Sequence, residues 1–314
     1  IDTVPLGQNA QWSYDPFAGT IDNGRVYGLG SVDDKAPMAA MLHVAESLTA
    51  RREQMRGKLI VVCAADEEVG GRLGTKWLAD QGYIPECDFI VVGEQTHNQV
   101  ATAHKGVLRA AFHVAGRTSH ATDPWRGRNA INGMAHLIVD LERYQTETLE
   151  PRVHPLLGPP SINVGLIEGG VGSNVVADAC TIRVDRRMVP GEDPAEVRRE
   201  LEAIVAARQA ADPSRTYSVD SFLVSNWFQS TLDDPLGQTF LQISADETQT
   251  AAEPIGYLPG SDAKHMVDKA RRGMIVFGPG TYQVAHSTDE YTDVQELHTT
   301  ARILQRFADE VLFS

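Results

Sequence analysis

The stretch VVCAADEEVGG, residues 61–71, joins an apolar run to three consecutive carboxylates, Asp66, Glu67 and Glu68. Carboxylates this close together raise one another's pKa, and their charge costs free energy unless a cation or a proton offsets it. The full apolar run, KLIVVCAAD at 58–66, predicts a strand that is buried on both faces of a parallel sheet. The stretch therefore predicts an α/β fold with a charged site at the end of one strand.

Two more runs of the same kind occur along the chain, DFIVVGE at 88–94 and GMIVFGPG at 273–280. Apolar residues at helical spacing predict helices over 35–52 and 292–313. Strands that are buried on both faces need helices on both sides of their sheet. The sequence therefore predicts an α/β domain with a mostly parallel sheet and helices on both of its faces.

The middle of the chain has a different pattern, which predicts a second domain. The strands and helices expected there follow in the order β-α-β-β-α-β, at residues 107–116, 127–144, 161–169, 179–188, 194–211 and 216–224. This order is typical of a ferredoxin-like α+β domain. We therefore expect a discontinuous first domain, residues 1–105 and 223–314, interrupted by an inserted second domain, residues 106–222.

The composition limits the classes of partner. The formal net charge of −14 over 314 residues argues against nucleic acid and anionic membranes, which need clustered Lys and Arg. Three widely spaced cysteines, Cys63, Cys87 and Cys180, fit neither a disulfide framework nor a metal motif, and indicate a cytoplasmic protein. The chain begins without Met on the strand-like IDTVP, so we expect that it is N-terminally truncated.

Several predicted strands deliver a possible metal ligand at the same end. Glu68 and Glu94 follow the first two runs, and His286 lies just beyond the third. Asp33 stands after a glycine-rich turn at the start of a helix, and Asp2 is a further candidate. Open α/β sheets bind ligands at the carboxyl ends of their strands, and carboxylates with imidazole suit zinc, cobalt or manganese. Each residue alone is more often a solvated or capping residue, so their convergence is what predicts a metal site.

The motifs that contain these residues resemble one known family. It is the family of zinc-dependent deacylases and peptidases that includes acetylornithine deacetylase, succinyl-diaminopimelate desuccinylase, aminoacylase and glutamate carboxypeptidase. The resemblance covers nearly the whole chain, and Ala36 departs from it by standing where the family usually has glycine. It rests on these motifs in order: IDTVP, WSYDPF, GRVYGLGSVDDKAPMAAML, DEEVGG, VVGEQT, GRTSHATDPWRGRNAI, GGVGSNVV, VDRRMVPGE and FGPGTYQVAHSTDEY.

The resemblance implies a catalytic domain that binds two divalent metal ions, zinc in the first place and cobalt or manganese as alternatives. It implies that Asp33 bridges the two ions and that Glu68 and His286 complete one site. Glu94 would belong to the other site. Family members have a cis peptide bond after the bridging aspartate, so we expect the bond between Asp33 and Asp34 to be cis.

The resemblance also implies roles for the other acids near the start of the chain. The remaining metal ligand of the family is a histidine whose position lies just upstream of Ile1, and Asp2 would orient it. Glu67 resembles the general base, which takes a proton from the attacking water and hands it to the leaving amine. Asp66 matches no such role, and we expect it to be a structural hydrogen-bonding residue.

The inserted domain resembles the lid of the family, through which its members form homodimers. His120 matches a histidine that reaches into the partner's active site and steadies the oxyanion. Asn174 and Arg187 match residues that hold the substrate, and Arg187 suits a carboxylate. Ser261 and Asp262, in PGSDAK, resemble a loop that lines the substrate pocket. Taken alone, His120 is a loop histidine with local hydrogen bonds, and Arg187 is a surface residue of a strand.

Three functions therefore compete on the sequence. The first is a di-metal hydrolase that cleaves the amide bond of an N-acyl amino acid, of the deacetylase or desuccinylase type, or of a small peptide. The second is an inactive relative or fragment that acts as a binding protein. The third is a nucleotide-binding enzyme, suggested by YGLGS at 27–31 and EGGVGS at 168–173, although neither loop is a complete phosphate-binding motif.

Overall fold

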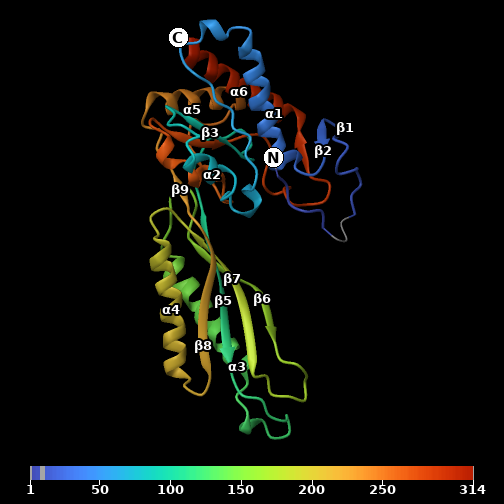
Figure 1. Cartoon of the computed structure of the whole chain (residues 1–314), viewed down its shortest axis with the longest axis vertical. Coiled ribbons are helices and arrows are strands. Elements are labelled where there is room, and N and C mark those ends of the chain that lie inside the picture. The colour runs from blue at the N-terminus through green and yellow to red at the C-terminus, as the bar shows by residue number, and fades with distance from the viewer. Residues whose placement is uncertain (1, 8–10, 314) are drawn as a thin grey trace. The chain divides into compact units, whose positions relative to one another are not determined.

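The computed structural model describes residues 2–7 and 11–313, which divide into two compact units (Figure 1). Unit 1 comprises Ile1–His104 and Phe228–Ser314, and unit 2 comprises Lys105–Trp227. Both units combine sheets with helices, so the predicted α/β fold class is confirmed. Among the helices of the described residues, none has both the length and the apolar character that crossing a membrane requires.

The main sheet of unit 1 is mixed. Its strands lie in the order β10-β4-β11-β3, and β9 pairs with β4. The pair β11/β3, which two of the predicted apolar runs form, is parallel as expected. The pair β10/β4 is also parallel, whereas β11/β4 and β4/β9 are antiparallel. The strands are β3 Ile90–Gly93, β4 Ala101–His104, β9 Phe228–Gln229, β10 Ile255–Tyr257 and β11 Met274–Phe277.

Helices cover both faces of this sheet. The strand β11 has apolar side chains on both faces, and each face is buried against helices. Ile275 and Phe277 pack in one core cluster with α1, α5 and α6, and Met274 and Val276 pack in another with α2. The helices are α1 Ala36–Thr49, α2 Thr75–Asp80, α5 Pro235–Thr248 and α6 Val294–Phe313. The rest of unit 1 includes a small antiparallel sheet of β1 Thr20–Asp22, β2 Arg25–Tyr27 and β12 Tyr291–Asp293.

The strand predicted over residues 58–66 is wrong. The structure assigns no strand to this segment, and the side chains of Leu59 and Val62 are 39% and 42% exposed. A strand exists only as part of a hydrogen-bonded ladder with a neighbour. An apolar, β-branched composition gives a segment the propensity for a ladder but does not supply the neighbouring strand.

Unit 2 contains the element order β-α-β-β-α-β that the sequence predicts. Its four strands form one antiparallel sheet in the order β6-β7-β5-β8. Buried residues of α3, α4 and alternate strand positions form one core on a single face of this sheet. The elements are β5 Gly106–Ala115, α3 Ala130–Arg143, β6 Ser161–Gly169, β7 Ala179–Met188, α4 Pro194–Ala211 and β8 Thr216–Ser225.

A buried ion pair lies between β7 and the loop before α4. Arg186 is completely buried, and its Nη2 donates to Glu192 Oε1 over 2.5 Å. Glu192 also accepts from Arg152 Nη1 at 3.2 Å and from the backbone N–H of Val189 at 2.9 Å. A buried guanidinium is tolerated only while such partners offset its charge.

We expect Glu192→Ala to lower the free energy of unfolding by about 3–5 kcal/mol, because Arg186 would stay buried without its main partner. Urea denaturation followed by circular dichroism measures this change. Glu196→Ala is the control, since Glu196 is exposed and pairs with Arg199 at 3.4 Å. It should change the free energy by less than about 1 kcal/mol. Equal losses in the two variants would contradict the role of the buried pair.

Candidate metal centre

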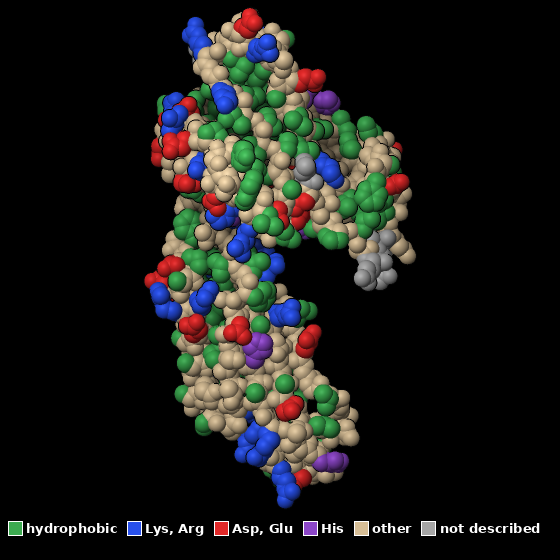
Figure 2. All heavy atoms as spheres, in the orientation of Figure 1, with side chains coloured by type: hydrophobic (Ala, Val, Ile, Leu, Met, Phe, Trp, Pro, Cys, Tyr) green, Lys and Arg blue, Asp and Glu red, His purple; other side chains and the backbone are tan. Residues whose placement is uncertain are grey.

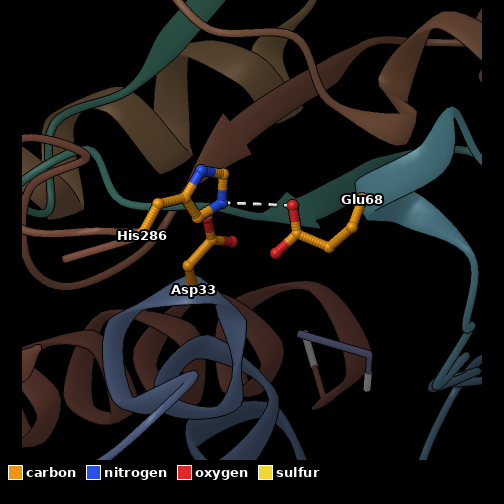
Figure 3. Close-up of side chains that lie close together, drawn as sticks. All are labelled: Asp33, Glu68 and His286. Carbon is orange, nitrogen blue, oxygen red and sulfur yellow. Dashed lines mark ion pairs between the residues drawn. The ribbon is translucent and has the colours of Figure 1, made fainter. Parts of the chain in front are cut away.

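Three predicted ligands of unit 1 meet in space (Figure 3). His286 Nε2 lies 3.1 Å from Glu68 Oε2 and 3.2 Å from Asp33 Oδ2. One possible donor atom from each of the three residues lies within 4.8 Å of the others. The side chains point toward one another from three segments that are far apart in the sequence.

The three segments are short turns rather than regular elements. Asp33 lies in the turn Ser31–Lys35 ahead of α1, and the peptide bond between Asp33 and Asp34 is cis, as predicted. Glu68 lies in the single helical turn Glu67–Val69. His286 follows β11 and has a positive φ of 59°, which is uncommon for a residue other than glycine. Short turns and loops therefore carry all three side chains to one place in unit 1.

Glu94 lies directly after β3 and is almost completely buried. Its Oε2 accepts hydrogen bonds from Tyr257 Oη at 3.0 Å and from Gln95 Nε2 at 3.1 Å. Burial raises the pKa of Glu94 well above its ordinary value, and the charges of Glu67 and Asp33 add to this effect. Glu94 does not belong to the group of Asp33, Glu68 and His286, but the negative charge of Asp33 contributes to its raised pKa.

Glu67 lies beside Glu68 and faces a buried lysine. Lys264 Nζ is 3.9 Å from Glu67 Oε1, and the lysine side chain is only 4% exposed. Burial raises the pKa of Glu67 to about 8, and the positive charge of Lys264 acts against this rise. Glu67 therefore lies next to a predicted ligand without belonging to the group of three.

The remaining acids of this region bond to backbone N–H groups. Asp66 Oδ2 accepts from the N–H of Leu73 at 2.7 Å, which is the structural role expected for it. The two carboxylate oxygens of Asp2 accept from the N–H groups of Glu67 and Glu68, each at 3.3 Å. Asp2 thus touches the turn that carries both glutamates, and its orienting role remains a prediction.

Two predicted substrate contacts of unit 1 are buried and have local partners. Ser261 Oγ accepts from the N–H of Ala263 at 3.3 Å. Asp262 Oδ2 accepts from Thr75 Oγ1 at 2.5 Å, and its Oδ1 lies 3.4 Å from Lys264 Nζ. These bonds hold the loop in place, and the contact with a substrate remains a prediction.

The other predicted substrate residues belong to unit 2. His120 is exposed, and its Nδ1 accepts from the N–H of Thr122 at 3.2 Å. The carbonyl of Asn174 accepts from the N–H that follows His120, at 3.0 Å, so these two residues are neighbours. Arg187 Nε donates to Asp185 at 2.7 Å. Their roles in binding or catalysis remain predictions.

Three residues near the site were missed by the sequence analysis: Tyr257, Lys264 and Glu290. Lys264 stands two positions after Asp262, and Glu290 stands four positions after His286, so both lay within motifs already noted. Tyr257 carried no local signal, because its partner Glu94 is 163 positions away.

The residues present fit a divalent cation. Burial raises the pKa of Glu68 to about 7 and that of Asp34 to about 6, and neighbouring acids add to both shifts. The pKa of Asp33 is also raised by burial, against the effect of His286. Such shifts mark negative charge that the surrounding side chains do not fully offset. Carboxylates with one imidazole are ligands that zinc, cobalt and manganese accept.

The fold and this donor set are typical of metal-dependent hydrolases. The model of peptidase family M20/M25/M40 matches residues 1–310, and the chain belongs to this family. Membership makes the chain a hydrolase that acts on amide bonds, in a family whose peptidases use divalent metal ions.

Curated relatives and solved structures agree with this assignment. Acetylornithine deacetylase of Myxococcus xanthus is 31% identical over 307 residues, which cover 97% of this chain and 77% of the relative. The enzyme of the same name from Proteus mirabilis is 28% identical, with 96% and 76% covered. An M20 family metallo-carboxypeptidase from Sulfolobus solfataricus has a TM-score of 0.76 at 16% identity, with 98% and 82% covered. Human carnosine dipeptidase 1 has a TM-score of 0.70 at 15% identity, with 98% and 79% covered, so both structures share the fold.

We expect the free energy of unfolding of the metal-free protein to fall as the pH rises from about 5 to about 8. The pKa values of Glu68 and Glu67 are raised from 4.5 to about 7 and about 8. The folded state therefore binds more protons than the unfolded state within this window, and each rise in pH favours unfolding. Thermal unfolding in the presence of a chelator measures the effect.

Zinc added at the upper end of this range should restore the lost stability, because a bound cation replaces the protons. The double variant Glu67→Gln, Glu68→Gln is the control, and its stability should depend much less on pH. A midpoint of unfolding that rises with pH in the metal-free protein would contradict the charge balance described above.

Proposed function

We propose that the chain is a deacylase that hydrolyses the amide bond of an N-acyl amino acid. The observation that carries this proposal is the close approach of Asp33, Glu68 and His286 to one another in unit 1. The similarity to acetylornithine deacetylases favours an N-acetyl group, with N-succinyl amino acids and small peptides as alternatives. Such an enzyme would act in amino-acid metabolism.

Two divalent metal ions belong to the proposal, with zinc preferred over cobalt and manganese. Asp33, Glu68 and His286 would hold one ion, and Glu94 would hold the other together with Asp33. Ions at these positions supply Lewis-acid chemistry, which polarises an amide carbonyl and makes water a better nucleophile. The buried and strongly acidic surroundings of Glu94 support a second cation close to it.

Glu67 is the general base of the proposal. It takes a proton from the attacking water and gives it to the leaving nitrogen, which departs as an amine. Its position directly before Glu68 places a second carboxylate beside the ligand group. Lys264, 3.9 Å from Glu67 Oε1, provides a positive charge that favours the ionised form that a base needs.

The proposal extends to the residues that would hold the substrate. His120 would stabilise the oxyanion, and Asn174 and Arg187 would bind the substrate from unit 2. Ser261 and Asp262 would shape the pocket from unit 1. The exposed ring of His120 supports its part in this scheme, because a free face is needed to reach a substrate.

We also propose that unit 2 forms a homodimer and that the protein is cytoplasmic. Strand β6 lies at the edge of the sheet of unit 2, and Leu166 and Ile167 on it are 56% and 57% exposed. An edge strand with exposed apolar residues is suited to pairing with a second chain.

The free cysteines Cys63, Cys87 and Cys180 support a reducing compartment. On the face shown in Figure 2, acidic and basic side chains are interspersed, which favours a small substrate over nucleic acid.

We expect the purified chain to release free amine from N-acyl amino acids when zinc, cobalt or manganese is present. Rates on N-acetylornithine, an N-succinyl amino acid and a dipeptide should rank the acyl groups. A chelator should abolish turnover, and added metal should restore it, because the water and the carbonyl both need the cation. Metal binding without turnover of any of these substrates would instead favour the binding-protein alternative.

Glu67→Gln should retain metal and lose turnover by about 10²- to 10⁴-fold, since it keeps the shape of the side chain but removes the base. Glu68→Gln should weaken metal binding instead, because it removes a charged ligand. Metal content by mass spectrometry and amine release by a colorimetric assay separate the two outcomes. Identical behaviour of the variants would contradict this division of roles between neighbouring glutamates.

A further inference from the structure

One buried carboxylate near the metal centre, Glu290, has no ligand or catalytic role in the proposed function. Glu290 is only 1% exposed. Its Oε1 accepts from the backbone N–H groups of Val32 at 2.9 Å and Asp33 at 3.1 Å, and its Oε2 accepts from that of Gly30 at 2.9 Å. A buried carboxylate is costly unless it is hydrogen-bonded, and these three donors satisfy both of its oxygens.

The turn that Glu290 binds is the one that presents Asp33. Gly30 has a φ of +73°, and a Cβ there would collide with Thr3 and lie 2.6 Å from Lys35 Nζ. The side chain of Val32 is completely buried, so its packing also restrains the turn. The backbone of Asp33 thus has little freedom once its N–H group is bound to Glu290.

The segment that carries Glu290 also carries His286, four positions earlier. It is joined to the Asp33 turn by two more bonds. The N–H of Gly28 donates to the carbonyl of Glu290 at 3.0 Å, and Thr292 Oγ1 donates to the carbonyl of Ser31 at 2.6 Å. The short segment 286–292 therefore contains the imidazole of His286 and also binds the backbone of the turn that carries Asp33.

We propose that Glu290 is a positioning residue of the metal centre, which sets the distance between Asp33 and His286 by binding the N–H groups of the Asp33 turn. This inference rests on the proposed metal-binding function. Its chemical basis is that a carboxylate offers two acceptor oxygens and no donor. An amide in its place would turn an N–H donor toward backbone N–H groups and lose at least one of the three bonds.

The test is the substitution Glu290→Gln in the full chain. Metal-free protein is titrated with Co²⁺, and the visible absorption of the bound ion reports its ligand geometry. We expect binding about 10- to 100-fold weaker than in the unsubstituted chain, which is the usual effect of losing a residue that orients ligands, together with a changed spectrum. Unchanged affinity and an unchanged spectrum in the folded variant would overturn the proposal.

Glu247→Gln is the matched control. Glu247 is a partly buried carboxylate of unit 1 that accepts from Arg302 at 3.1 Å and Arg306 at 2.7 Å on α6. Glu247 also accepts more than one hydrogen bond, but its donors are arginine side chains and none of them belongs to the Asp33 turn. Its affinity and spectrum should match those of the unsubstituted chain. An equal loss in this control would also overturn the proposal, because the effect would then be general.

A second variant decides the case in which Glu290→Gln does not fold. Thr292→Val keeps the shape of the side chain and removes only the bond to Ser31, so it should weaken Co²⁺ binding to a smaller degree. Unchanged binding in this variant would then overturn the proposal. If the unsubstituted chain itself bound no Co²⁺, the proposed metal-binding function would be contradicted. Equal Co²⁺ binding by the unsubstituted chain and the variants would contradict only the positioning role of Glu290.

Discussion

Negative charge enclosed by the loops of unit 1 is the constraint on which this region depends. Glu67, Glu68 and Glu94 all have raised pKa values because burial removes the water that would screen them. Hydrophobic packing cannot offset such charge, whereas cations, protons and hydrogen-bond donors can. The described side chains bring Lys264 and His286 against this group. The charge balance therefore connects stability, proton binding and metal binding in one place.

The scaffold meets this constraint by separating packing from chemistry. The strand β11 is buried on both faces and contributes to both hydrophobic clusters of unit 1, whereas the ligand candidates lie in turns and loops outside the strands. Backbone N–H groups bound by Asp2, Asp66 and Glu290 fix these turns where regular elements end. Carboxylates thus serve two purposes here, since some face the proposed cation and others fasten the backbone that presents them.

Local patterns predicted much of the fold and only part of the site. Helices α1 and α6 and the six elements of unit 2 followed from apolar periodicity, which each segment carries in its own sequence. The strand expected at 58–66 failed because pairing is not a local property. The grouping of Asp33, Glu68 and His286 was anticipated from their places after apolar runs and from the family motifs. Glu290 was missed because its bond to Val32 spans 258 positions, and no spacing rule reports such contacts.

The pairing of β4 with β9 has a consequence for how this chain tolerates change. Ala103 and His104 lie opposite Gln229 and Phe228, so the chain leaves and re-enters unit 1 on adjacent, hydrogen-bonded strands. For unit 1, the whole of unit 2 is therefore a closed loop whose ends are already joined. The entropic cost of closing a flexible loop rises by only about 0.6 kcal/mol for each doubling of its length. Insertions or deletions within unit 2 should thus leave the folding of unit 1 almost unaffected, which would let the two units diverge at different rates.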